Sequence, residues 1–139
     1  MSLAATLAPV FAQVALTFAL LLWLGRLRVP AVRSGEVAMA DIAVSEDAWP
    51  VQTRQASNAF SNQFELPMLF YVAVALALIA GAVSALFVVL AWLFVAARCV
   101  HAAIFITSNH VPLRALAYSV GFAFLGLMWL VLLATVMFA

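Results

Sequence analysis

Long apolar runs alternate with short polar segments along this chain, and the alternation predicts membrane-crossing helices. Residues 3–25 are apolar apart from two threonines and Gln13, and the run stops at Arg26 and Arg28. A helix rises about 1.5 Å per residue, so roughly 20 residues cross the roughly 30 Å hydrocarbon layer of a bilayer. The first run is therefore long enough to form a membrane span.

The remaining apolar sequence divides into three further spans. The uncharged run over residues 66–97 is too long for one crossing, and it is interrupted near Gly81, where small residues favour a turn. We therefore predict a tight hairpin between a second span over about 54–81 and a third span over about 84–108. A fourth span is predicted over about 113–138.

Polar residues concentrate between the first two predicted spans, and we expect a membrane-surface loop over about 26–53. Its acidic side chains are expected to be solvated: Glu36, Asp41, Glu46 and Asp47. The whole pattern predicts one domain over residues 1–139, an all-α, integral membrane four-helix bundle.

Composition agrees with this fold class and excludes others. The chain is 69% hydrophobic and 8% charged, whereas a soluble domain of this size needs far more polar surface. Its net charge of +1 argues against nucleic-acid binding, which requires a basic surface. The single cysteine, Cys99, excludes an intrachain disulfide, and His101 has no nearby companions, so we expect no metal site.

The distribution of arginine predicts the orientation in the membrane. Arg26, Arg28 and Arg33 follow the first span, Arg54 precedes the second span, and Arg114 opens the fourth. The positive-inside rule then places both of these connections in the cytoplasm and the two termini and the hairpin outside. The N-terminal residues lack the basic region of a signal peptide, so we interpret the first run as a retained helix. The lysine-free, alanine-rich composition suggests a bacterial inner membrane.

Two charged residues are forced into the bilayer by this topology. Counted from the hairpin, Glu65 lies about 24 Å along the second span and Arg98 about 21 Å along the third. An isolated charge at the centre of a membrane helix costs at least ~2.5–3.5 kcal/mol, so pairing is the natural solution. We therefore predict that Glu65 and Arg98 face each other inside the bundle.

Polar residues accompany Glu65 on the second span. Asn58, Asn62 and Glu65 follow the spacing i, i+4, i+7 and share one helical face. Pro67 cannot donate a backbone hydrogen bond to Gln63, so we expect a kink that frees a carbonyl acceptor. This stripe is either a structural network that locks the helices together or one wall of a polar cavity.

A second polar group is predicted where the third and fourth spans meet. His101 lies one turn after Arg98. Arg114 stands near the N-terminus of the last helix, a partly positive place that suits an anion or a thiolate, and Tyr118 follows one turn later. The simpler alternative is that Arg114 is a membrane-border anchor and Tyr118 an interface aromatic.

These motifs together resemble one known family. The stretch over residues 58–67 (NAFSNQFELP) is similar to the second-helix signature of the MAPEG family, membrane-associated proteins in eicosanoid and glutathione metabolism. Arg98-x-x-His101 followed by Pro112-x-Arg114-x-x-x-Tyr118 is similar to the end of helix three and the start of helix four in eicosanoid-type members. The resemblance extends over the whole chain, including its length and its four spans.

The resemblance implies a homotrimeric four-helix bundle that binds glutathione in cytoplasm-facing clefts between subunits. It implies that Asn62 and Glu65 hold the peptide part of glutathione and that Arg98 supports Glu65. It further implies that Arg26 is contributed by the first helix of the neighbouring subunit.

The resemblance also implies a catalytic role for Arg114. Arg114 would stabilise the glutathione thiolate, with His101 and Tyr118 lining the cleft. A thiol with a pKa near ~8.5 becomes a better nucleophile when a fixed cation lowers that pKa. The lipophilic cosubstrate would arrive through the lipid.

The chain departs from the family pattern at three positions. Asn58 stands where eicosanoid-type members usually have Arg, Phe105 where they often have Tyr, and Ser61 where the prostaglandin synthase branch has a basic residue. These changes remove contacts that would hold anionic glutathione.

With this resemblance, we weigh three hypotheses for the function. The first is a glutathione-dependent transferase or peroxidase that acts on lipophilic electrophiles. The second is a non-catalytic MAPEG-fold membrane protein whose polar network is structural or binds another ligand. A small proton-coupled transporter is disfavoured, because its carboxylate is expected in the first span, where this chain has only Gln13, and because a Glu paired with Arg98 is a poor proton carrier.

Overall fold

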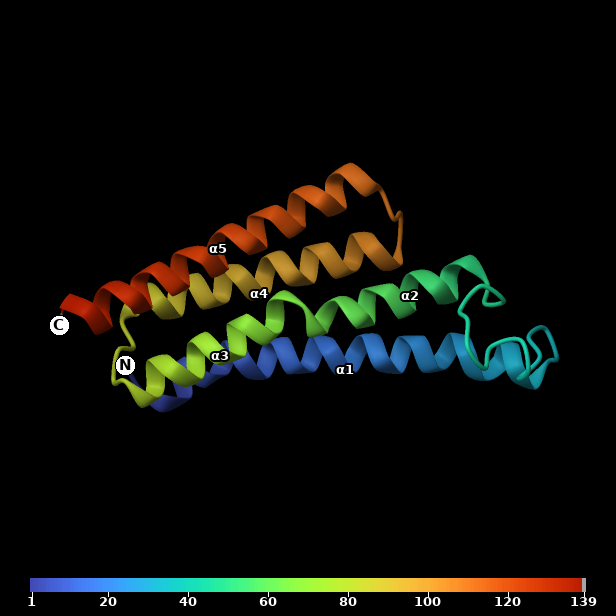
Figure 1. The fold of residues 1–139 in the computed structure, drawn as a ribbon, viewed down its shortest axis with the longest axis horizontal. Coiled ribbons are helices and arrows are strands. Elements are labelled where there is room, and N and C mark those ends of the chain that lie inside the picture. Colours follow the sequence, from blue (N-terminus) through green and yellow to red (C-terminus); the bar gives the residue numbers. More distant parts are fainter. Residues whose placement is uncertain (139) are drawn as a thin grey trace.

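A computed structural model describes residues 1–138 of the chain. It is all-helical, and long helices lie side by side along one axis (Figure 1). The helices are α1 (Leu3–Arg33), α2 (Val51–Ser61), the 3-10 turn η1 (Asn62–Phe64), α3 (Leu66–Ile79), α4 (Ala85–Ile106) and α5 (Val111–Phe138).

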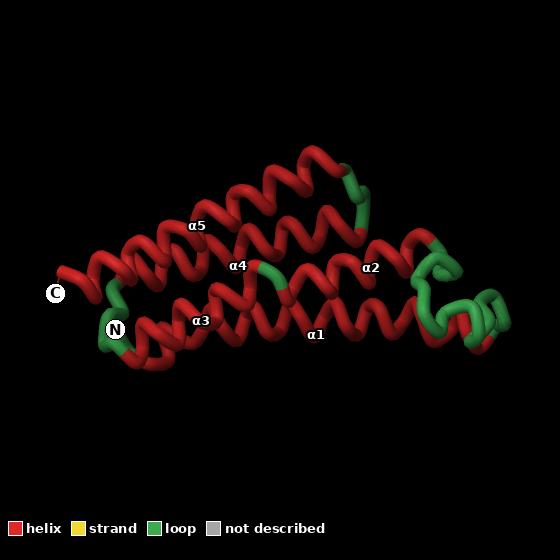
Figure 2. Tube along the Cα trace, viewed as in Figure 1, coloured by secondary structure: helices red, strands yellow, loops and turns green. Residues whose placement is uncertain are grey.

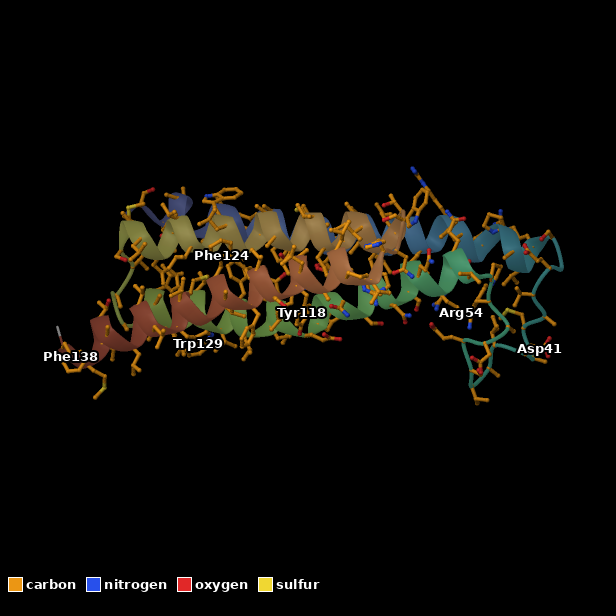
Figure 3. The ribbon with its side chains drawn as sticks, turned by 90° about the horizontal axis from the view of Figure 1, so that it is seen from above. Asp41, Arg54, Tyr118, Phe124, Trp129 and Phe138 are labelled. Carbon is orange, nitrogen blue, oxygen red and sulfur yellow. The ribbon has the colours of Figure 1, made fainter. Side chains whose placement is uncertain are left out.

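Four of the helical rods are long and apolar enough to cross a membrane. They are Leu3–Arg33, Val51–Ile79, Ala85–Ile106 and Val111–Phe138, so α2, η1 and α3 together make one crossing. The predicted four-helix membrane bundle is confirmed, and the chain is an integral, multi-pass membrane protein. Both termini lie at the end that also holds the α3–α4 turn (Figure 1). Charged residues such as Arg54 and Asp41 lie at the opposite end from Phe138 (Figure 3).

The core lies where α4 packs against α3 and α5. Phe70 of α3 stacks on Phe94 of α4 with ring centroids 4.8 Å apart, and Met128 of α5 is fully buried in the same cluster. Gly121 of α5 faces α4, and a Cβ built there would make ordinary contacts, 3.6 Å from the Cβ of Ala97 and 3.9 Å from Cδ of Arg98. Apolar packing therefore fixes the spacing of α4 and α5 beside Arg98.

The second span is interrupted as Pro67 predicts. α2 ends at Ser61, a single 3-10 turn follows, and Glu65 has a non-helical backbone (φ −96°, ψ −105°) before α3 begins. Figure 2 shows this non-helical piece between α2 and α3. Proline is tolerated here because it occupies the first turn of a new helix, where its missing N–H has no intrahelical partner to lose.

The break is tied to the first helix by a buried pair of amides. Gln13 Nε2 donates to Gln63 Oε1 at 2.9 Å, and Gln63 Nε2 donates to the carbonyl of Ala59 at 2.9 Å. Both glutamines are almost completely buried. This contact holds α1 against the interruption that carries the polar stripe of the second span.

The first helix is longer than the span predicted within it. α1 has 31 residues, about 46 Å at 1.5 Å per residue, and continues past the predicted end at residue 25 through Pro30 to Arg33. The extension is stabilised by tertiary packing, since Ala31 lies in a small buried cluster with Val37 and Trp49. The connecting segment that lacks helix is therefore 34–50, shorter than the loop predicted over about 26–53.

One acid of this segment, Glu46, is exposed as expected but also contacts other side chains. The carboxylate of Glu46 pairs with Arg28 Nη2 and also accepts a hydrogen bond from Ser57 Oγ at 2.8 Å. The Arg28 guanidinium lies 5.1 Å from the centroid of the Trp49 ring. The folded segment brings Glu46 back onto α1 and α2, which a loop prediction from composition cannot anticipate.

Candidate ligand-binding cleft

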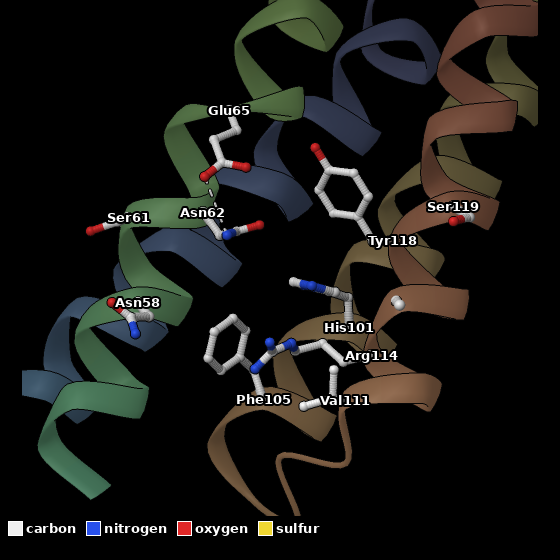
Figure 4. A pocket seen from close by; sticks show the side chains of 11 residues that line it. Asn58, Ser61, Asn62, Glu65, His101, Phe105, Val111, Arg114, Tyr118 and Ser119 are labelled. Atoms are coloured by element: carbon white, nitrogen blue, oxygen red, sulfur yellow. Dashed lines mark hydrogen bonds between the residues drawn. The ribbon is translucent and has the colours of Figure 1, made fainter. Parts of the chain in front are cut away.

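A cleft of about 530 Å³ opens between α2 and η1 on one side and α4 and α5 on the other (Figure 4). Its lining is a mixture of polar, charged and aromatic side chains from both walls. These residues are Asn58, Ser61, Asn62, Glu65, His101, Phe105, Val111, Arg114, Ala115, Tyr118 and Ser119.

The cleft gathers most of the residues singled out from the sequence. Asn62 and Glu65 stand on one wall, and His101, Arg114 and Tyr118 stand on the other (Figure 4). They come from three of the four spans, so the bundle brings together residues that are distant in sequence.

Sequence reasoning missed three small or apolar lining residues on α5. Val111, Ala115 and Ser119 follow i, i+4, i+8, and they share the cleft-facing side of the helix with Arg114 and Tyr118. Val111 lies one turn before Arg114 and Ala115 one turn before Tyr118, so the i−3 neighbours of the two predicted residues would have found both, and Ser119 follows one turn after Ala115.

Arg98 lies behind the cleft wall and is fully buried. Its Nη2 donates to the backbone carbonyl of Asn62 at 2.9 Å, and its guanidinium carbon lies 5.9 Å from the centroid of the Tyr118 ring. Nε and Nη1 have no hydrogen-bond partner within residues 1–138. The acceptor made available at the break is thus the carbonyl of Asn62, one residue before the Gln63 carbonyl predicted from Pro67.

The predicted direct pairing of Glu65 with Arg98 is wrong. Within residues 1–138, the one salt bridge joins Arg28 and Glu46. Asn62 stands between the two groups, because its carbonyl accepts from Arg98 while its Nδ2 donates to Glu65 Oε1 at 3.3 Å. The physical reason is the helix break, which leaves Glu65 exposed in the cleft while Arg98 stays inside.

Two aromatic rings enclose His101 at the floor of the cleft. Its ring centroid lies 5.7 Å from that of Phe105 and 5.7 Å from that of Tyr118. His101 is only 3% exposed, and its Nδ1 has no hydrogen-bond partner in the part of the chain that the structure describes. The floor is therefore mainly aromatic, with one buried imidazole.

Arg114 carries the positive charge on the cleft wall. Its Nη1 donates to the side-chain oxygen of Asn109, and its guanidinium carbon lies 4.0 Å from the centroid of the Phe105 ring. No carboxylate of residues 1–138 lies within ion-pair distance of it. Arg114 also sits in the first turn of α5, where the helix dipole adds partial positive charge.

The two formal charges on the lining belong to Glu65 and Arg114, on opposite walls. Such an arrangement suits a ligand with an ammonium at one end and an anionic group at the other. Amide and hydroxyl groups of Asn58, Ser61 and Ser119 add neutral hydrogen-bonding capacity along the walls.

Arg26 lies apart from this cleft within the chain. It lines a separate surface groove on α1 together with Leu22, Gly25, Val29 and other residues. One copy of the chain therefore does not join Arg26 to the other predicted site residues.

Comparison with known proteins identifies the family. No curated protein and no solved structure matches this chain. The sequence profile of the MAPEG family matches residues 6–134, a range that includes every residue lining the cleft. Members of that family often use glutathione. With the four apolar spans, this match shows that the chain belongs to the MAPEG family.

Proposed function

We propose that this protein binds glutathione in the cleft and joins its sulfur to lipophilic electrophiles. The observation that carries the proposal is Arg114, a guanidinium on the cleft wall that no carboxylate of residues 1–138 neutralises. A fixed cation of this kind favours the charged form of a thiol placed beside it.

The opposite wall would receive the peptide part of glutathione. The Glu65 carboxylate is exposed in the cleft and suits the ligand's ammonium, while the Asn62 side chain is in place to contact the peptide groups. Arg98 supports this wall through Asn62, since its hydrogen bond to the Asn62 carbonyl fixes the backbone at the break.

The reaction would be nucleophilic attack by sulfur. The thiol proton leaves to solvent, the thiolate forms a bond with an electrophilic carbon, and the leaving group departs with its electron pair. Arg114 lowers the pKa of the thiol from near ~8.5, so more thiolate is present at neutral pH. His101 and Tyr118 shape the aromatic side of the cleft, and the apolar cosubstrate would enter from the lipid.

A homotrimer would complete this site. Arg26 is exposed on α1 outside the cleft of its own chain, where a neighbouring subunit would receive it. Its charge would then help to hold the anionic groups of glutathione that Asn58 and Ser61 cannot neutralise. The same proposal places the cleft and the 34–50 segment on the cytoplasmic side, following the positive-inside rule.

A specific observation favours a second candidate, a non-catalytic MAPEG-fold protein. Arg98, Asn62 and Glu65 are joined by hydrogen bonds to one another, and Phe105 covers one face of Arg114. In this alternative the polar residues lock the helices and hold another ligand or none.

One experiment separates the two candidates. Glutathione binding to the detergent-purified protein is measured by calorimetry, and conjugation is measured with a generic chloroaromatic electrophile. The proposal expects binding and turnover that are lost in Arg114→Ala, whereas Arg33→Ala, which removes an exposed arginine at the end of α1, serves as the matched control. Absence of binding at millimolar glutathione would leave the non-catalytic candidate.

A further inference from the structure

The turn between α4 and α5 contains Asn109, which accepts a hydrogen bond from the side chain of Arg114. Asn109 lies in this turn with a left-handed backbone (φ 47°), a conformation that asparagine adopts more readily than most residues. Its N–H donates to the carbonyl of Ile104 at 2.7 Å, and its side-chain oxygen accepts a hydrogen bond from Arg114 Nη1. Asn109 thus links the turn to α4 through its backbone and binds Arg114 of α5 through its side chain.

We propose that Asn109 is a positioning residue that aims Arg114 into the cleft while leaving its positive charge available to an anionic sulfur. This inference rests on the proposed glutathione function and adds to it the residue that orients Arg114 without neutralising its charge.

Two contacts fix the plane of the Arg114 guanidinium. Phe105 lies against one face, with 4.0 Å between the guanidinium carbon and the ring centroid, and the Asn109 oxygen meets one edge. A guanidinium has five N–H donors in a rigid fork, and Asn109 takes one of the two nitrogens at its tip. Since Arg114 makes no other side-chain hydrogen bond within residues 1–138, its remaining donors are available to a ligand.

Asn109 is neutral, and its lack of charge matters for the electrostatics of the cleft. An aspartate of the same shape would accept the same hydrogen bond, but its negative charge would cancel much of the field that Arg114 exerts on a nearby thiol. An amide oxygen orients the guanidinium without that cancellation. The isosteric pair Asn and Asp therefore separates orientation from charge.

Activity as a function of pH tests this inference in the purified protein. Asn109→Asp should move the acidic limb of kcat/KM for the electrophile, measured at saturating glutathione, upward by about one pH unit, because each unit of the bound thiol's pKa changes the thiolate fraction about tenfold below that pKa. Ser108→Asp is the matched control, since it adds the same charge to the same turn at an exposed residue that does not contact Arg114. An unshifted limb in Asn109→Asp, or an equal shift in both variants, overturns the proposal.

Asn109→Gly tests orientation without adding charge. Glycine tolerates the positive φ and removes only the acceptor, so kcat/KM should fall severalfold while the acidic limb stays at the wild-type pH. Wild-type kcat/KM in this variant contradicts a positioning role. The Asn109→Gly variant also keeps the proposal testable if Asn109→Asp fails to fold.

A readout without glutathione separates this inference from the proposed function. Phenylglyoxal modifies accessible arginines, and mass spectrometry gives the rate at Arg114 in the ligand-free protein. Asn109→Gly should raise that rate severalfold, while Ser108→Ala leaves it unchanged. Equal rates in wild type and Asn109→Gly overturn the positioning role, whereas an inactive wild type with the expected rates contradicts only the glutathione function.

Discussion

The buried hydrogen bond between Gln13 and Gln63 allows a direct test of how α1 stabilises the helix break that forms one wall of the cleft. It joins α1 to the break beside Asn62 through a hydrogen bond of 2.9 Å, and both side chains are almost completely buried. Gln63 Nε2 donates a hydrogen bond to the Ala59 carbonyl, whereas Gln13 Oε1 has no partner within the described chain. The two residues are therefore unequal, and their substitutions should have unequal costs.

The magnitudes follow from what each substitution leaves behind. Gln13→Leu removes one interhelical hydrogen bond, worth about 0.6 and up to about 1.7 kcal/mol in membrane proteins. It leaves Gln63 Oε1 without its donor, but it also removes the Gln13 oxygen that has no partner within the described chain. Gln63→Leu removes the same interhelical bond and also the hydrogen bond from Gln63 Nε2 to the Ala59 carbonyl. It leaves Gln13 Nε2 unpartnered beside a Gln13 oxygen that already has no partner within the described chain, and an unsatisfied buried group costs about 1–3 kcal/mol. We therefore expect Gln63→Leu to destabilise the protein more than Gln13→Leu.

The assay is a double-mutant cycle on unfolding in mixed micelles. The double variant Gln13→Leu with Gln63→Leu should cost less than the sum of the single costs by about 0.6–1.7 kcal/mol. Thr17→Val is the control, since it removes a hydrogen bond within α1, from Thr17 Oγ1 to the Gln13 carbonyl, and leaves the amide pair intact. Additive single costs, or a larger effect of Gln13→Leu, would refute the reasoning.

Three further predictions follow from other contacts. Glu65→Gln should change the free energy of unfolding by less than about 1 kcal/mol, because Glu65 is exposed and receives one weak hydrogen bond, yet it should weaken glutathione binding about tenfold in calorimetry. Glu46→Gln should cost about 0.2–1 kcal/mol by weakening the exposed Arg28 pair and should speed proteolysis within the 34–50 segment; unchanged proteolysis would contradict this. Gly121→Leu should lower stability by about 1–3 kcal/mol in thermal unfolding by overpacking against Arg98, whereas Gly121→Ala should be tolerated.

The sequence was sufficient to predict the spans and one wall of the cleft. Apolar runs of membrane length leave little choice of fold, because a bilayer admits only helices or closed barrels. The helical spacing of Arg114 and Tyr118 likewise placed both residues on one face of α5, and the structure puts both on the cleft.

The predicted pairing of Glu65 with Arg98 was wrong, and the contact between Asn109 and Arg114 was not predicted, because both depend on backbone geometry that residue spacing does not contain. Matching depths brought Glu65 and Arg98 to the same level, but depth does not say which way a side chain points after a helix break. The break turned Glu65 into the cleft and left the Asn62 carbonyl to meet Arg98. The hydrogen bond between Asn109 and Arg114 depends on a left-handed backbone conformation in the turn, which no periodic pattern of the sequence predicts.

The central claim is that Arg114 holds glutathione as a thiolate in the cleft, and ultraviolet difference spectroscopy measures this directly. With saturating glutathione at neutral pH, below the ~8.5 pKa of a free thiol, the wild-type protein should show thiolate absorption that Arg114→Ala lacks. Wild-type protein that binds glutathione without thiolate absorption, or an Arg114→Ala variant with the same absorption, would contradict the claim.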